Sequence, residues 1–142
     1  MRILGIDHGT VRIGIAISDE LQMLAQPLCF IPAEPPKKLF EELLRIITEN
    51  DVKIIIVGMP RNMNGTYGPA AEKVKKFVSE LKSYTQLPIH FIDERLTSTQ
   101  ANKSLTAVGI KGKKKRESVD AAAASIILQT YLDSPANTNG HL

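Results

Sequence analysis

Acidic residues stand at the ends of three predicted elements. Asp7 closes the first apolar run, and Asp93 and Glu94 close a later one. Asp120 lies in the first turn of a helix that the residue spacing predicts over 118–132. Carboxylates brought close together raise one another's pKa, so a divalent cation that compensates their charge makes such a cluster favourable. Ligands that are all oxygen atoms select Mg²⁺ or Mn²⁺, which are therefore the predicted cofactors.

Metal ions held by carboxylates suit the hydrolysis of phosphodiesters. Two ions about 3.5–4 Å apart would activate a water molecule and stabilise the leaving oxygen during in-line attack. This chemistry needs no covalent nucleophile. Each acid taken singly has an equally good structural interpretation, because Asp7 stands at a predicted turn and Asp120 at a helix N-terminus that favours negative charge.

Two arginines flank the acids. Arg12 follows Asp7 along the chain and Arg95 follows Glu94 directly. Either guanidinium could hold phosphate oxygens in a bidentate manner, or it could form a salt bridge that orients Asp93 or Glu94. The sequence supports the two interpretations equally.

Two further segments carry candidate contacts to a nucleic acid. Residues 58–65 follow a predicted strand and are rich in turn formers, so they form either a substrate-facing loop, with contacts from Arg61, Asn62 and Asn64, or a plain surface connection. The net charge is only +3, but basic residues gather just before Asp120. Runs of charge are usually solvated, yet a mobile basic loop at this position is well placed to hold a phosphate backbone. The cluster consists of Lys111, Lys113, Lys114, Lys115 and Arg116.

Hydrophobic periodicity predicts a mixed α/β order. Three consecutive β-rich runs form an antiparallel meander, with a turn at residues 8–10. Two β-α units then follow in succession and imply parallel strands with right-handed crossovers. The predicted strands are 3–6, 11–18, 23–31, 53–58 and 88–92, and the predicted helices are 39–47, 69–84, 97–108 and 118–132.

The predicted elements bring the acids to one edge of the sheet. Ligand sites in open α/β sheets lie at the carboxyl ends of the strands, so Asp7 and Glu94 meet if their strands are neighbours. Asp93 and Glu94 are adjacent and point to opposite faces, so we expect only one of them to enter the site. The small residues Ala121 to Ala124 are expected to let the last helix approach the sheet closely.

Length and composition limit the class of protein. A chain of 142 residues fits a single domain, predicted over 1–133, followed by a flexible polar tail over 134–142. The single cysteine, Cys29, excludes an intramolecular disulfide and is typical of a reducing compartment. The apolar runs are too short for a signal peptide or a membrane span, so we expect a cytoplasmic protein with no membrane partner.

Four blocks of sequence resemble the YqgF family over nearly the whole chain. They occur in the order and at the spacing of that family, whose members are ribonuclease H-like proteins described as Holliday-junction resolvases and as pre-16S rRNA nucleases. The blocks are Gly5–Ala16, Gly58–Pro60, Asp93–Ser98, and Asp120–Ala124 continued by Ile127–Leu132.

The resemblance implies a ribonuclease H-like fold with a five-stranded sheet. It also implies that Asp7, Glu94 and Asp120 are the catalytic, metal-binding acids, and it favours Glu94 over Asp93. The expected function is metal-dependent endonucleolytic cleavage of structured nucleic acid in 5′-end maturation of pre-16S rRNA, hence in ribosome biogenesis. The alternative is resolution of Holliday junctions in branched DNA. The expected partners are pre-rRNA or branched DNA, with possible association with the ribosome, and the chain acts as a monomer or a homodimer.

Two other classes of function are weighed against a nuclease. Residues 7–10 resemble the first phosphate loop of actin-like and sugar-kinase ATPases, but those proteins need a second domain that this length cannot supply. A non-catalytic nucleic-acid or ribosome-associated binder would gain nothing from clustered carboxylates, because its ligand is a polyanion.

Overall fold

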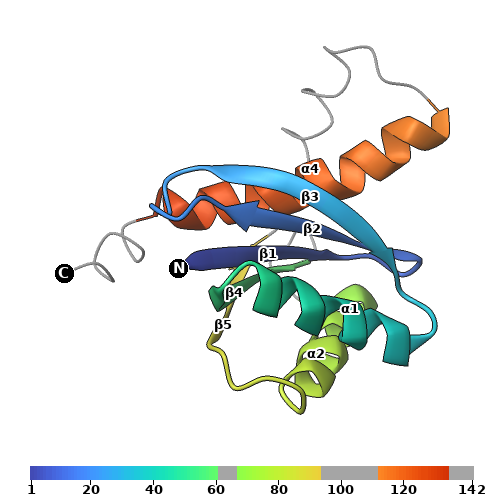
Figure 1. Ribbon diagram of the computed structural model, residues 1–142. Helices are drawn as coiled ribbons and strands as arrows, with labels where there is room; N and C mark the ends of the chain where they lie inside the picture. Colours follow the sequence, from blue (N-terminus) through green and yellow to red (C-terminus); the bar gives the residue numbers. More distant parts are fainter. Residues whose placement is uncertain (61–66, 94–111, 135–142) are drawn as a thin grey trace.

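The computed structural model describes residues 1–60, 67–93 and 112–134, and for 112–120 it describes the helix but not the side chains. The described elements follow the predicted order (Figure 1). The predicted helix over 97–108 lies outside the described residues. In chain order, the elements are β1 (Arg2–His8), β2 (Arg12–Ser18), β3 (Ala25–Pro32), α1 (Pro36–Glu49), β4 (Val52–Met59), α2 (Pro69–Leu81), β5 (Ile89–Asp93) and α4 (Gly112–Leu132).

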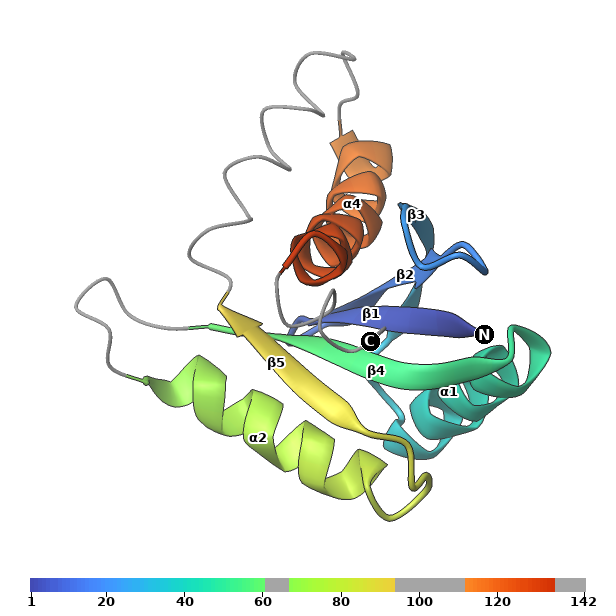
Figure 2. The ribbon, with the colours of Figure 1, turned by 90° about the vertical axis from the view of Figure 1, so that its left-hand side faces the viewer.

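The five strands form one mixed sheet in the order β3-β2-β1-β4-β5. Strand β2 pairs antiparallel with both β1 and β3, whereas β4 pairs parallel with both β1 and β5. The predicted fold class, an α/β protein with a mixed five-stranded sheet, is confirmed. Strands β1, β4 and β5 therefore end at the same edge of the sheet, as Figure 2 shows.

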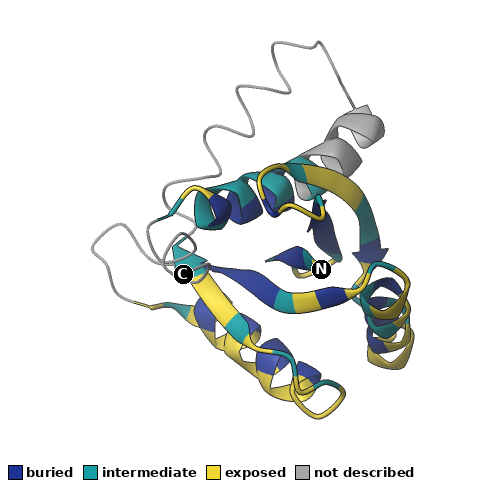
Figure 3. Ribbon diagram, turned by 60° about the vertical axis from the view of Figure 1, so that its left-hand side comes forward, coloured by how far each residue is buried: buried dark blue, intermediate teal, exposed yellow. Residues whose placement is uncertain are grey.

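Burial differs between the middle of the sheet and its two sides. The central strands β1 and β4 are covered on both faces, as their unbroken apolar runs predict. The outer strands β3 and β5 carry exposed residues along their length (Figure 3).

Helices α1 and α2 cover one face of the sheet. Their apolar residues recur at helical spacing and join the larger core with the even-numbered residues of β1, Leu4 and Ile6. Pro36 occupies the first turn of α1, where its missing N–H costs no hydrogen bond. The buried residues of the two helices are Leu39, Phe40, Leu43, Ile46, Ala71, Val74, Phe77, Val78 and Leu81.

Helix α4 covers the opposite face and approaches β1 very closely. A Cβ atom placed on Gly5 would lie 2.8 Å from the Cβ of Leu128 and 3.0 Å from the carbonyl oxygen of Ala124. Both distances are too short for a methyl group, so only glycine at position 5 permits this approach. The close approach expected of the alanine segment is thus found at Ala124.

A glutamine fixes the C-terminal half of α4 over the start of β3. The Gln129 side chain accepts a 2.8 Å hydrogen bond from the N–H of Ala25 and donates a 3.0 Å bond to the carbonyl oxygen of Met23. Ala25 pairs with Ser18 at the end of β2, and the hydroxyl of Ser18 accepts from the N–H of Ile3. Gln129 therefore lies near the start of β1, so α4 runs antiparallel to β1.

The start of α4 differs from the prediction. The helix begins at Gly112 rather than at Ser118, so the basic residues Lys113 to Arg116 belong to its first turns and not to a loop. Lysine and arginine are good helix formers, and the interpretation as a loop gave their charge more weight than their propensity. Asp120 consequently lies about two turns inside the helix rather than in its first turn.

Candidate active site

Asp7 lies near the end of β1 on the face that α4 covers. It is half-buried and pairs with Gly14 of β2. Because side chains alternate along a strand, Asp7 shares its face with Ile3, which packs against α4, and with Gly5. The predicted acid at the carboxyl end of the first strand is therefore placed beneath a helix and is not only a turn residue.

Sheet register relates Asp7 to the last strand. Ile6 is level with Val57 of β4, which is level with Phe91 of β5. One residue further along, Asp7 is level with Ile92, whose side chain packs on the α4 side of the sheet. Glu94 and Arg95 lie outside the described residues and follow directly after the end of β5.

Asp93 lies on the opposite face of the sheet. It pairs with Met59, whose side chain belongs to the core beneath α1 and α2. Asp93 also lines a cavity with Tyr67 and Lys75 at the start of α2. Of the two adjacent acids, Asp93 therefore does not share the face of Asp7.

Arg12 begins β2 on the same face as Asp7. The register pairs Arg12 with Pro32 and Gly14 with Phe30, so these side chains follow the alternation of Asp7. The guanidinium carbon of Arg12 lies 5.8 Å from the centre of the Phe30 ring, a cation–π arrangement that holds the side chain on this face. Arg12 thus lies on the face of Asp7, two residues before Gly14, the partner of Asp7 in the sheet.

The other predicted site residues are described only in part or not at all. Asp120 lies in α4, one turn before Ala124, and Lys113, Lys114, Lys115 and Arg116 lie in its first turns, in each case without a described side chain. Arg61 and Asn62 lie outside the described residues. Among the side chains that the structure describes, no three of His, Cys, Asp or Glu form a potential metal cluster.

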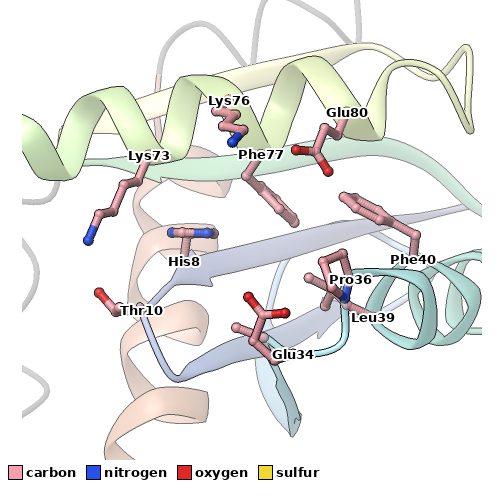
Figure 4. A pocket seen from close by; sticks show the side chains of 11 residues that line it. His8, Thr10, Glu34, Pro36, Leu39, Phe40, Lys73, Lys76, Phe77 and Glu80 are labelled. Carbon is pink, nitrogen blue, oxygen red and sulfur yellow. The ribbon is translucent and has the colours of Figure 1, made fainter.

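His8 points away from Asp7. Its ring lies 4.9 Å from the ring of Phe77 in α2, centre to centre, and it lines a cavity of about 300 Å³ between β1, α1 and α2 (Figure 4). Burial lowers the pKa of His8, and the charge of Lys73 acts in the same direction, while Asp7 opposes the shift. A mostly neutral imidazole on the far face takes no part in a carboxylate site, and His8 is not among the predicted site residues.

The donor chemistry of the Asp7 face suits a hard divalent cation. At the end of β1 the described donor on this face is the Asp7 carboxylate. His90 of β5 also lies on this face, but it is level with Gly5 rather than with Asp7, and its ring stacks on Tyr131 of α4 at 6.1 Å, centre to centre. His8 and Cys29 pack on the other face against the core of α1 and α2. Burial also raises the pKa of the Cys29 thiol, so it stays protonated. Carboxylate oxygen without imidazole or thiolate is the donor type of Mg²⁺ and Mn²⁺ rather than of Zn²⁺.

Sequence reasoning missed the basic residues of α2. Lys73, Lys75 and Lys76 are exposed on the first two turns of this helix, which begins at the edge of the sheet where β4 ends. A helix that follows a parallel strand begins at the carboxyl edge of the sheet, where ligand sites lie. Three lysines within four residues of such a helix could therefore have been predicted from the sequence as candidate contacts to a nucleic acid.

The fold resembles that of two solved Holliday-junction resolvases. The fold resembles RuvC of Thermus thermophilus, solved with a Holliday-junction substrate, with a TM-score of 0.58 and 13% identity over 94% of this chain and 96% of that chain. The Fowlpox virus Holliday junction resolvase gives a TM-score of 0.53 and 14% identity over 94% of this chain and 99% of that chain. At these identities the likeness concerns the fold, and it confirms the ribonuclease H-like architecture.

The family follows from sequence similarity. The model of the RuvX family, described as Holliday junction resolvase, matches residues 1–134, and the chain belongs to this family. A protein of Chloroflexus aggregans is 44% identical over 135 residues, 95% of each chain, and one of Thermoanaerobacter pseudethanolicus is 47% identical over 138 residues, 96% of this chain and 99% of the relative. Both bear the name "Putative pre-16S rRNA nuclease". The resemblance to the YqgF family and the enzyme class, a nuclease that hydrolyses phosphodiesters, are confirmed.

Proposed function

We propose that the chain is a metal-dependent endonuclease that cleaves structured RNA in 5′-end maturation of pre-16S rRNA. The names of relatives that match nearly its full length support the substrate. The observation that carries the chemistry is the position of Asp7 at the carboxyl edge of the sheet, on the face against which Gly5 lets α4 pack.

Asp120 is proposed to complete the site from α4. The backbone of Gly5 contacts the helix at Ala124 and Leu128. From Gly5 to Asp7 the strand advances about 7 Å, and from Ala124 to Asp120 the antiparallel helix advances about 6 Å in the same direction. This arithmetic supports a position of Asp120 beside Asp7.

Glu94 is proposed as the third acid. Asp93 ends β5 on the α2 side, so a further extended residue would alternate to the side of Asp7. Together, Asp7, Glu94 and Asp120 would hold Mg²⁺ or Mn²⁺, which when bound supplies an activated water and charge stabilisation for phosphodiester hydrolysis. The carboxylates themselves would fix the position of the ion and exclude softer metals.

Basic residues around these acids are proposed to bind the substrate. Arg12 lies on the Asp7 face and is suited to bidentate contact with a phosphate. The basic residues in the first turns of α4 are at most two turns beyond Asp120 along the same helix, so a strand cut at the acids would pass them. The proposed contacts are Arg12, Arg61, Asn62, Arg95, Lys113, Lys114, Lys115 and Arg116.

Resolution of Holliday junctions is the second candidate function. The description of the matching family favours it. A resolvase cuts two strands symmetrically and would act as a homodimer, whereas a nuclease that trims RNA can act as a monomer.

No helix in the described part of the chain is long and apolar enough to cross a membrane. Action in the cytoplasm, with association with the ribosome, is proposed together with the rRNA substrate.

Cleavage assays test the proposal. The purified protein is incubated with a labelled pre-16S rRNA fragment and with a four-way DNA junction, in Mg²⁺, in Mn²⁺ and in EDTA. We expect metal-dependent cutting of the RNA and none by Asp7→Asn. Cutting of the junction alone would establish the second candidate. Failure to cut either substrate in any metal would contradict the nuclease and favour a binding role.

A further inference from the structure

A second cavity lies at the catalytic edge of the sheet, on the face opposite Asp7. Met59 and Asp93 contribute to it from the last residues of β4 and β5, and Phe91 contributes from β5. Tyr67 and Lys75 contribute from just before α2 and from its first half. The cavity, here called the β5–α2 pocket, has a volume of about 440 Å³, within the range of small-molecule sites. Figure 2 shows the start of α2 beside the end of β5.

Two aromatic side chains of this pocket remain open to solvent. Tyr67 is 50% exposed and Phe91 is 44% exposed. Both rings therefore leave apolar surface uncovered at the edge where the nuclease site is proposed. Proteins that bind unpaired nucleotides combine exposed aromatic rings, on which the π-face of any base can stack, with cations that bind the negative phosphate.

Charged groups of opposite sign lie in and beside the pocket. The Lys75 ammonium lies 4.9 Å from the centre of the Tyr67 ring, so the cation and the ring form one surface, and it also forms an exposed ion pair with Glu72 at 3.7 Å. The carboxylate of Asp93 lines the same cavity and repels a phosphate. A nucleotide would therefore place its base within the pocket, where Asp93 can accept from an amino group, and its phosphate towards Lys75.

The pocket lies within reach of a strand bound at the active site. Strands β1 and β5 are separated by β4 alone, so their axes are about 10 Å apart within the sheet. A strand bound at Asp7 would also have to pass round the carboxyl edge to the other face, so the path takes a few unpaired nucleotides.

We propose that the β5–α2 pocket binds one unpaired nucleobase of the RNA strand being cut, a few nucleotides from the scissile phosphate. The base stacks on Phe91 and Tyr67, and Lys75 holds the neighbouring phosphate. This assignment rests on the proposed nuclease function and adds a requirement for unpaired nucleotides next to the cleavage site. A base in a continuous duplex is already stacked and cannot enter.

Fluorescence of 2-aminopurine tests the pocket without requiring cleavage. Single-stranded RNA fragments spanning the cut carry the probe at successive positions and are titrated with the Asp7→Asn protein, which we expect to bind the RNA without cutting it. We expect quenching at one position, and no quenching when the probe lies within a duplex. Phe91→Leu removes the ring but keeps an apolar side chain, and should weaken binding about 5-fold or more. Phe91→Tyr keeps a ring and should bind like the parent.

Control variants separate the pocket from general effects. Tyr84→Ala removes an aromatic ring of similar exposure beyond the far end of α2, and Lys82→Ala removes a cation at that end. Neither should change the affinity. Equal affinities of Phe91→Leu and the parent, with no quenched position, would overturn the assignment even if wild-type protein cuts RNA. Quenching lost in Phe91→Leu, in a protein whose wild type cuts nothing, would leave the pocket established and contradict the nuclease.

Discussion

The two faces of the sheet carry different chemistry at the edge where β1, β4 and β5 end. Asp7 faces α4, which glycine and alanine allow to lie against the sheet. His8, its neighbour in β1, faces α2 and packs against Phe77. The α2 side also carries lysines and open aromatic rings. Alternation along a single strand thus separates a carboxylate suited to metal binding from groups suited to holding a nucleic-acid strand.

The largest difference between the faces is expected for their acids. Asp7→Asn removes a charge at constant size, and we expect the rate of metal-dependent cleavage to fall about 100-fold or more, since even outer-shell partners of a metal contribute about 10–100-fold. Asp51→Asn makes the same change at the opposite edge, where Asp51 pairs with Lys53, and should leave the rate unchanged. Initial rates at saturating Mg²⁺ measure both, and equal rates for the two variants would remove Asp7 from the mechanism.

A side chain at position 5 would disrupt the close contact between α4 and β1. Gly5→Ala forces the helix away from β1, and we expect the free energy of unfolding to fall by about 1–3 kcal/mol. Cleavage should fall as well, because the helix carries Asp120. Ile3→Val, in the same cluster, should lower stability by about 0.5–1.5 kcal/mol and leave cleavage intact. Urea unfolding and cleavage rates measure the pair, and unchanged stability of Gly5→Ala would show that α4 does not depend on this contact.

The attachment of α4 at its other end is expected to matter less. Gln129→Leu removes the hydrogen bonds to Ala25 and Met23, together with an exposed one to Asp133 within the helix, and we expect a loss of about 1–2 kcal/mol in the free energy of unfolding. Thr130→Ala is the control, because its hydroxyl bonds only to Ile126 within the helix, and it should cost about 0.5 kcal/mol or less. Equal losses would mean that the amide adds nothing beyond the packing of the helix.

The smallest effect concerns protonation on the α2 face. Burial lowers the pKa of His8 below 6.5, so below that pH the unfolded chain binds the proton more readily than the folded one. The stability that neutral His8 provides is complete above pH 6.5 and is lost as the pH falls towards its folded pKa. Urea unfolding of wild type and His8→Gln at pH 7.5 and pH 5.5 measures the contribution of His8 to the pH dependence of the free energy of unfolding. Identical pH dependence in the two proteins would contradict a buried, neutral His8.

Most of the fold could be predicted because local patterns determine it. The unbroken apolar run of β4 predicts a buried strand. The helical spacing of the apolar residues in α2 predicts a helix, and these residues are Val74, Phe77, Val78 and Leu81. The predicted start of α4 was wrong by about two turns, because the basic residues before Ser118 suit either a helix or a solvated loop.

The position of a candidate site residue could be predicted only where it depends on a single strand. The place of Asp7 follows from the end of β1, but the face on which Asp93 lies follows from its pairing with Met59, which no local pattern contains. The β5–α2 pocket joins Tyr67 to Phe91 through tertiary packing, so its parts look unrelated in the sequence. Alternation gives the face of a residue, whereas register and packing decide its neighbours.

Binding of Mn²⁺, followed by electron paramagnetic resonance, tests most directly whether the α4 face holds the metal. Free Mn²⁺ is titrated with wild type, Asp7→Asn and His8→Gln, which change adjacent residues on opposite faces of β1. We predict that wild type and His8→Gln bind Mn²⁺ equally and that Asp7→Asn binds it about 10-fold or more weakly. Undiminished binding by Asp7→Asn, or loss of binding in His8→Gln, would contradict the placement of the metal site on the face of Asp7.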